Sequence, residues 1–190
     1  MTRKPQAAFT LPEVLVVIAL VAVMSSLLAG IFLSNNRFYE NQSGEIQAVS
    51  ATRQAADYLN EAGRASTSLS ASIVYSGTTY TQGANLVIFQ MPALDASKAI
   101  IAGTYDYVIL GRDPDNPFPT RLIYIVSAAP GSYRKSRLVE LSNKLASINF
   151  TYDNADPNIA RNINYDLTLT YAGRTPGSET VHGGVSLRNK

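Results

Sequence analysis

A long stretch without a charged residue dominates the N-terminal part of this sequence. Residues 14–33 are apolar apart from Ser25, Ser26 and Gly30. A helix needs about 20 consecutive apolar residues to cross the hydrocarbon core of a bilayer, so the stretch predicts a membrane-spanning helix. Glu13 stands directly before it, and a carboxylate at the edge of such a helix is costly unless it has a partner. Glu13 is therefore the first candidate for a functional residue.

The residues around the apolar stretch argue against an ordinary secretory signal. Such a signal has an apolar region of roughly 7–15 residues, followed by a small-residue cleavage site. Here the apolar region is longer and the small pair Ala7-Ala8 precedes it, so cleavage after Ala8 would leave the helix on the mature protein. Because Arg3 and Lys4 also precede the helix, the positive-inside rule puts residues 1–8 in the cytoplasm and the remainder outside.

The boundary between the basic leader and the apolar helix carries a specific motif. It consists of a small residue, phenylalanine, threonine, leucine, a variable residue and glutamate: Ala8, Phe9, Thr10, Leu11, Pro12 and Glu13. With its leader and helix, the motif resembles the processing and methylation signal of prepilins, the precursors of type IV pilins and type II secretion pseudopilins. Ala8 departs from the glycine that prepilins usually have at this position, although it is small enough to enter the peptidase site. The resemblance covers only the N-terminal part of the chain.

This resemblance implies both a processing step and a set of partners. A membrane-bound prepilin peptidase would cut between Ala8 and Phe9 and methylate Phe9. Other pilin or pseudopilin subunits and an inner-membrane assembly platform would be further partners. The subunit would span the inner membrane with its leader in the cytoplasm, and would then enter a periplasmic or extracellular filament. The chain then divides into a leader at 1–8, a transmembrane and filament-core helix at 9–33, and a globular domain at 34–190.

The position of Glu13 predicts a role in assembly. After cleavage it is the fifth residue, about one helical turn from the free amine of Phe9. In a filament of staggered helices, its carboxylate would pair with the amine of a neighbouring subunit, because an unpaired carboxylate in an apolar medium is strongly penalised. Pro12 fits the first helical turn, where its missing N–H is not needed. The alternative is a simple signal anchor in which Glu13 is incidental.

The helical pattern continues beyond the membrane segment. Residues 34–65 contain no proline, and apolar or small residues recur close to the i, i+3, i+7 spacing of an amphipathic helix. Asn35, Asn36 and Gly44 are weak points at which this helix would bend or loosen. Gly63, followed by a Ser- and Thr-rich segment, predicts its end.

Strands are predicted for most of the remaining sequence. The expected segments are 73–75 and 80 as a hairpin, then 86–91, 105–110, 121–126, 146–152, 165–171 and 185–187, while 138–145 fits either a short helix or a strand. A helix followed by a run of strands predicts an α+β fold. The expected architecture is type IV pilin-like, with a long N-terminal helix packed through its amphipathic second half on an antiparallel β-sheet.

Two C-terminal segments resemble minor pseudopilins of the J type and related minor pilins. Residues 138–152 resemble the segment that opens the second half of their sheet, and 185–189 resemble a closing strand that often ends in Leu-Arg-Asn. The alternative is that alternating strand residues match many β-proteins. The sequence contains no cysteine, so a disulfide-closed C-terminal loop is excluded, which also favours a minor over a major subunit.

Two loops are rich in oxygen ligands: Asp113, Asp115 and Asn116 in the first, and Asp153, Asn154 and Asp156 in the second. Calcium takes six to eight oxygen ligands, and some pseudopilins hold calcium in a comparable loop. Asp, Asn and Pro are also the usual residues of turns. The turn interpretation is preferred, so calcium is only a weak candidate and no cofactor is expected.

The sequence shows no pattern that supports catalysis, and the chain is not expected to be an enzyme. His182 is the sole histidine, and it has no HExxH spacing and no nearby Gly-x-Ser-x-Gly. The net charge of +2 suggests no general field for nucleic acid, which is not an expected partner. Residues 134–137 form a small basic cluster that could contact an acidic partner or DNA, although such clusters are usually solvated loops.

These observations predict a non-enzymatic, membrane-inserted minor pilin or pseudopilin. Three systems remain open: type II secretion, an adhesion or motility pilus, and a competence pilus that takes up DNA. Only the basic cluster at 134–137 favours DNA uptake. A signal-anchored membrane protein with an exported β domain is the alternative from a different class.

Overall fold

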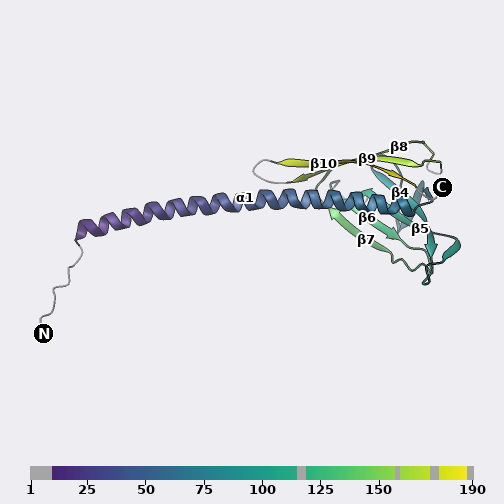
Figure 1. Cartoon of the computed structure of the whole chain (residues 1–190), viewed down its shortest axis with the longest axis horizontal. Helices are drawn as coiled ribbons and strands as arrows, with labels where there is room; N and C mark the ends of the chain where they lie inside the picture. The colour runs from purple at the N-terminus through teal and green to yellow at the C-terminus, as the bar shows by residue number, and fades with distance from the viewer. Residues whose placement is uncertain (1–9, 115–118, 157–158, 172–175, 188–190) are drawn as a thin grey trace, which may run out of the picture.

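The computed structural model describes residues 10–114, 119–156, 159–171 and 176–187. Its longest element is α1 (Leu11–Ala65), a single helix of 55 residues. The first half of α1 projects away from the rest of the molecule, whereas the second half lies against the strands (Figure 1). The predicted α+β arrangement, a long N-terminal helix packed on antiparallel sheets, is therefore confirmed.

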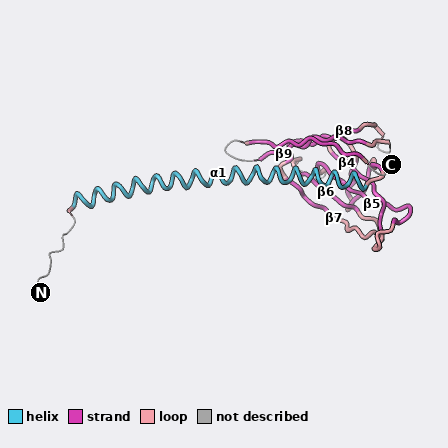
Figure 2. Tube along the Cα trace, in the orientation of Figure 1, coloured by secondary structure: helices cyan, strands magenta, loops and turns pink. Residues whose placement is uncertain are grey.

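Local sequence explains where α1 begins and ends. Thr10 is extended and caps the helix, with a proline in the first turn. At the other end, the backbone N–H of Ser66 donates to the carbonyl of Gly63 at 3.3 Å. Between these ends α1 is one unbroken helix with a gentle curve, including Asn35 and Gly44, where the sequence predicts a bend (Figure 2).

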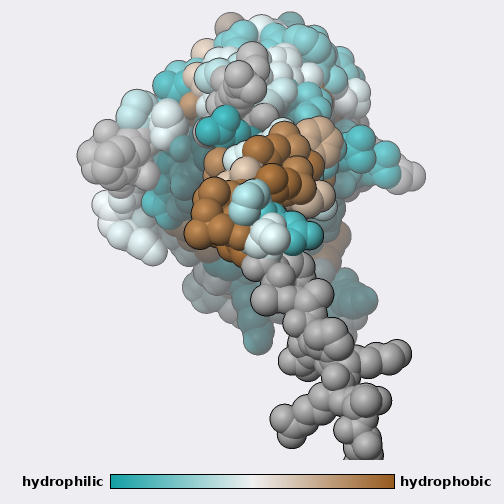
Figure 3. All heavy atoms as spheres, turned by 90° about the vertical axis from the view of Figure 1, so that its left-hand side faces the viewer, coloured by the Kyte–Doolittle hydropathy of each residue, from teal (hydrophilic) through white to brown (hydrophobic). Residues whose placement is uncertain are grey.

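No described part of the chain covers the first half of α1. Its large apolar side chains between Leu11 and Leu33 are 46% to 76% exposed. Seen from the N-terminal end of the helix, they form an apolar cluster in front of a largely hydrophilic domain (Figure 3). Among the residues that the structure describes, α1 is the one helix that is long enough and apolar enough to cross a membrane, judged by length and composition.

The larger sheet has five strands in the spatial order β1-β4-β5-β6-β7, all paired antiparallel. They are β1 (Ser68–Leu69), β4 (Leu86–Leu94), β5 (Ile100–Arg112), β6 (Leu122–Ser127) and β7 (Arg137–Ser142). A second, three-stranded antiparallel sheet has the order β10-β9-β8. Its strands are β8 (Leu145–Tyr152), β9 (Asn162–Tyr171) and β10 (Gly177–Ser186).

The main core lies between the second half of α1 and the inner faces of both sheets. Leu59 from the helix, Phe89 and Leu110 from the larger sheet, and Leu167 and Leu169 from the smaller sheet are fully or almost fully buried in it. These residues come from distant parts of the chain. The helix is therefore an integral layer of the domain.

A separate hairpin covers the other face of the five-stranded sheet. It consists of β2 (Ser72–Tyr75) and β3 (Thr78–Thr81), joined by a turn at Ser76 and Gly77, which both have positive φ. Its Tyr80 side chain is buried in a second, smaller cluster that includes Ile88 and Ile109. The β2–β3 hairpin thus shields the apolar outer face of the five-stranded sheet from solvent.

The structure decides between the two alternatives for residues 138–145. Residues 138–142 are strand and form most of β7, residues 143–144 connect the two strands, and Leu145 begins β8. A second segment differs from the prediction. The last strand begins at Gly177, well before the predicted 185–187, and pairs along its length with β9. The early part of this strand was not predicted because it contains glycines, and glycine usually weakens a strand. Here Gly183 lies beside the Tyr165 ring, which occupies the space that a Cβ would need.

Candidate functional site

The start of α1 is the candidate site, and Thr10 and Glu13 form its described part. The backbone N–H of Thr10 donates to Glu13 Oε2 at 3.3 Å, and the Thr10 hydroxyl lies 3.4 Å from the same oxygen. The two residues form a capping box, in which the third helical residue returns to the cap. Ala8 and Phe9, the predicted cleavage and methylation residues, lie outside the described residues.

The capping box gives Glu13 a role that the sequence analysis missed. The first N–H groups of a helix have no intrahelical acceptor, and a carboxylate at this position satisfies one of them and also opposes the helix dipole. The signal was available, because a threonine followed three residues later by glutamate is a capping-box pattern. In the single chain the Glu13 carboxylate is therefore exposed but already engaged by its own helix end.

The end of α1 is fixed tightly to the last strand. Gly63 lies so close to Val185 that a Cβ on residue 63 would overlap the Val185 side chain. Thr52 on the helix and Ser66 at its C-cap are buried, and their hydroxyls donate back to carbonyls of the preceding turn. The helix therefore connects the exposed apolar half to the sheets without a hinge in its described backbone.

Two of the aspartates considered for calcium, Asp113 and Asp153, have other partners. Arg121 connects Asp113 to Glu140, with a 3.1 Å contact to the first and a 2.6 Å contact to the second. Asp153 closes its own loop, accepting from the Arg161 backbone N–H at 2.9 Å and from the Asn162 amide at 3.0 Å. These hydrogen bonds lower the pKa of Asp153 below its ordinary value.

The described aspartates lie in two different loops. Asp113 lies between β5 and β6, Asp156 lies between β8 and β9, and Asp115 is outside the described residues. Within the described ranges there is no group of three or more His, Asp or Glu side chains placed to hold a metal ion. The described Asp113 and Asp153 are engaged by hydrogen bonds from neighbouring residues.

His182 forms an exposed cross-strand pair. Its Nδ1 lies 2.5 Å from Asp166 Oδ1, and the two residues are directly opposite each other on β10 and β9. Both side chains are more than half exposed. On the same two strands, the Thr168 and Thr180 hydroxyls form a second exposed cross-strand contact, at 3.0 Å.

Comparison with known proteins identifies the N-terminal segment. Residues 3–29 match the family model of the prokaryotic N-terminal methylation motif. This match supports the class of type IV pilin and pseudopilin subunits, and with it processing by a prepilin peptidase, assembly with other pilin subunits and a structural rather than enzymatic role. The motif and the apolar helix together fit a membrane-anchored pilin. A search of curated proteins found no significant match.

Proposed function

We propose that this chain is a minor pilin or pseudopilin that is cut between Ala8 and Phe9, methylated on Phe9 and incorporated into a filament. The observation that carries the proposal is the fully exposed apolar half of α1, which begins at the methylation motif and is continuous with a folded domain. An apolar surface of this extent needs lipid or other subunits to cover it. The proposed division is a leader at 1–8, an anchor and filament core at 9–33 and an exported domain at 34–190.

In this mechanism the same helix serves first as a membrane anchor and then as polymer core. Lipid and the filament interior are both apolar, so moving the helix between them needs little net free energy, and van der Waals fit decides the packing. An inner-membrane assembly platform would extract the subunit. The domain follows because its core includes the second half of the same helix.

Assembly would exchange one partner of Glu13 for another. In the single chain its carboxylate accepts from Thr10 at 3.3 Å, which is long for a hydrogen bond to a carboxylate. Cleavage creates a charged amine at Phe9, and the amine of a neighbouring subunit can offer a stronger, charge-assisted bond. This pairing would set the register of the filament, because a subunit in any other staggered position would bury the Glu13 carboxylate without a partner.

A type II secretion pseudopilus is the preferred system, on the resemblance of residues 138–152 and 185–189 to J-type subunits. The adhesion and DNA-uptake alternatives rest on fewer features. The basic cluster that favoured DNA is partly occupied, since Arg134 pairs with the buried Asp106 at 2.6 Å. A signal-anchored protein with an exported β domain would not require cleavage ahead of the helix.

Incorporation into filaments tests the proposal. We expect the full chain, expressed in a host with a prepilin peptidase and a filament system, to co-sediment with sheared filaments and to crosslink to their subunits. The matched control is the same chain in a host without the peptidase, where it should stay in the inner membrane. A chain that is cleaved but remains entirely in the membrane fraction in every pilus and secretion host would contradict a filament role.

A further inference from the structure

A groove at the end of α1 has no part in the proposed anchoring and assembly. It has a volume of about 300 Å³ and lies between the last turns of the helix, the inner face of the larger sheet and the loop that joins β6 to β7. Met91, Val108 and Val126 supply apolar lining from the sheet, and Tyr133 and Lys135 line it from the loop. This size lies at the lower end of the range for ligand sites, and the lining combines apolar and cationic groups.

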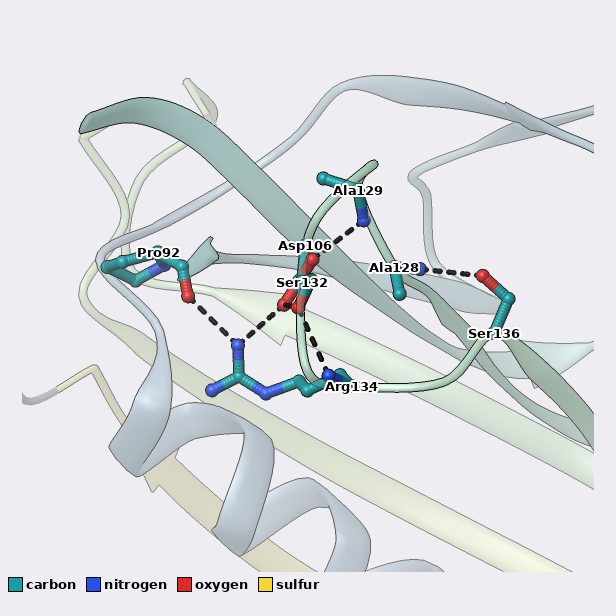
Figure 4. Close-up of polar contacts among 7 residues, drawn as sticks. All are labelled: Pro92, Asp106, Ala128, Ala129, Ser132, Arg134 and Ser136. Carbon is teal, nitrogen blue, oxygen red and sulfur yellow. Dashed lines mark hydrogen bonds and ion pairs between the residues drawn. The ribbon is translucent and has the colours of Figure 1, made fainter. Parts of the chain in front are cut away.

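Arg134 is held in this groove by a buried carboxylate. Asp106 is fully buried and accepts from Arg134 Nη1 at 2.6 Å, while the same nitrogen donates to the Pro92 carbonyl at 2.9 Å. The carboxylate is itself fixed by the Ala129 N–H at 2.8 Å and by the Ser132 hydroxyl at 2.7 Å. Figure 4 shows Ala129, Ser132 and Arg134 around Asp106, and the further contact from Arg134 to Pro92. The network sets the position of the guanidinium before any ligand arrives.

The two contacts leave part of the guanidinium for another partner. Both hydrogen bonds run through Nη1, and the guanidinium also lies over the Tyr133 ring, 5.5 Å from its centre. Within the described part of the chain, no hydrogen bond or ion pair engages Nε or Nη2 of Arg134. In Figure 4 the side chain lies between the loop and the end of α1, which is where the groove is. An arginine edge that presents two N–H groups matches the two oxygens of a carboxylate.

The other charges of the groove leave a cationic excess. Asp106 offsets Arg134, which leaves Lys135 and Arg137 against the single carboxylate of Glu61 in the lining. The Arg137 guanidinium lies over the Tyr124 ring, 5.6 Å from its centre. The Tyr124 hydroxyl also lines the groove as a neutral donor, and burial raises the pKa of this tyrosine further above 10.0.

We propose that this groove binds an acidic peptide segment of a partner protein, in which a glutamate or aspartate stands next to an apolar residue. The carboxylate meets the open edge of Arg134 together with Lys135 and Arg137, and the apolar side chain lies on Met91 and Val126. Charge complementarity selects the acid, and the apolar lining selects its neighbour. The inference does not depend on which filament the chain enters.

The same features disfavour a nucleic acid in this place. Binding to DNA uses many cations spread along the phosphate backbone, so that affinity comes from several neutralised charges. Here one of three cations is already offset by a buried carboxylate, and part of the groove lining is apolar. A short acidic segment needs no more cations than the groove offers.

Fluorescence anisotropy on the full chain in lipid nanodiscs tests the proposal, with empty nanodiscs as background. The probe is the amidated peptide Gly-Leu-Glu-Leu-Gly with a neutral dye, and its matched control has glutamine in place of glutamate. We expect the glutamine peptide to bind about tenfold more weakly, because it loses the charge-assisted bonds. Equal affinity of the two peptides, or no binding of either, would overturn the proposal.

Variants then assign the binding to this groove. Lys135→Glu should weaken the acidic peptide by about tenfold, whereas Lys144→Glu, the same charge change at the turn before β8, should leave it within about twofold. Arg134→Lys keeps a charge for Asp106 but loses the planar fork, and should also weaken binding by about tenfold without unfolding the domain. If Lys135→Glu and Lys144→Glu weakened peptide binding equally, the assignment to this groove would be wrong. It would also be wrong if a labelled single-stranded DNA bound more tightly than the acidic peptide and responded to the same variants.

Discussion

Gly63 of the helix and Val185 of the last strand are packed without room for one more methyl group. A Cβ on residue 63 would overlap Val185 Cγ1, and Val185 is itself buried. This contact joins α1 to β10, the strand with which the helix shares its most extensive interface, as the two elements lie side by side over the end of the helix (Figure 1). It fixes the end of α1 to the last strand of the smaller sheet.

Gly63→Ala should therefore destabilise the domain, although alanine is the better helix former. Forcing a methyl group into a packed site typically costs about 1–3 kcal/mol. The gain in helix propensity is roughly 1 kcal/mol, so the substitution destabilises the domain as long as the strand cannot move aside. We expect a lower thermal midpoint in detergent, measured by circular dichroism of the sheets. Gly30→Ala is the matched control, because nothing lies within 4 Å of its Cβ position.

Val185→Ala should relieve the clash if the explanation is correct. We expect the double variant to be more stable than the sum of the two single changes predicts, since the smaller strand residue makes room for the new methyl group. Strict additivity of the two changes would contradict the packing argument.

The comparison of sequence and structure shows which features local patterns can predict. The apolar run, the capping pattern and the alternating strands are local, so the long helix and most strands follow from them. The early start of β10 is not local, because Gly183 becomes acceptable only when Tyr165 of the neighbouring strand fills the space beside it. The pairing of Asp106 with Arg134 spans 28 residues and depends on the folded sheet.

Asp106→Asn should be among the more damaging polar substitutions in the domain. Asparagine can still accept from the Ala129 N–H, but the Arg134 charge loses its counterion, and breaking one side of a buried pair costs about 3 kcal/mol or more. Asp166→Asn, at the exposed pair with His182, should change stability by less than about 1 kcal/mol. Thermal midpoints of both variants check this, and equal effects would show that burial does not govern these pairs.

Stability should fall in alkaline solution because of buried tyrosines. Burial raises the pKa values of Tyr124, Tyr152 and Tyr165 above the ordinary 10.0, and the Tyr152 hydroxyl also donates to the Gly83 carbonyl at 2.9 Å. The folded chain then holds protons that the unfolded chain loses. The stability is fully present below about pH 10 and is lost as the pH rises above it.

The phenolate absorbance of the 11 tyrosines follows this titration directly. We expect the exposed tyrosines to ionise first, and a delayed group to ionise together with loss of the sheet signal in circular dichroism. If all tyrosines ionised together while the sheets stayed intact, the pKa shifts assigned to burial would be wrong.

Three substitutions of Glu13 separate its capping role from its proposed pairing role. Glutamine can replace glutamate in a capping box but carries no charge, so Glu13→Gln should keep the helix start and lose assembly. Glu13→Ala removes both the capping oxygen and the charge. Glu13→Asp keeps the charge on a shorter side chain, so its assembly should be intermediate between those of Glu13→Ala and the unchanged chain. Loss of one side of a buried pair costs roughly 3–5 kcal/mol, enough to reduce incorporation strongly.

Crosslinking to partner subunits measures assembly in this series, and a cleavage assay on the same samples is the control. All three variants should be cleaved and inserted into the membrane as the unchanged chain is, because these steps do not use the pairing. Normal assembly of Glu13→Gln together with failure of Glu13→Ala would assign Glu13 to capping alone and reject the pairing.

The intact mass and N-terminal sequence of the chain, purified from a host with a prepilin peptidase, test the central claim most directly. The account predicts a mature chain that begins at a methylated Phe9 and retains the whole of α1, because cleavage after Ala8 leaves the anchor in place. A mature chain that begins after Leu33, as an ordinary signal peptide would leave it, or one that keeps residues 1–8 in the presence of active peptidase, would contradict it.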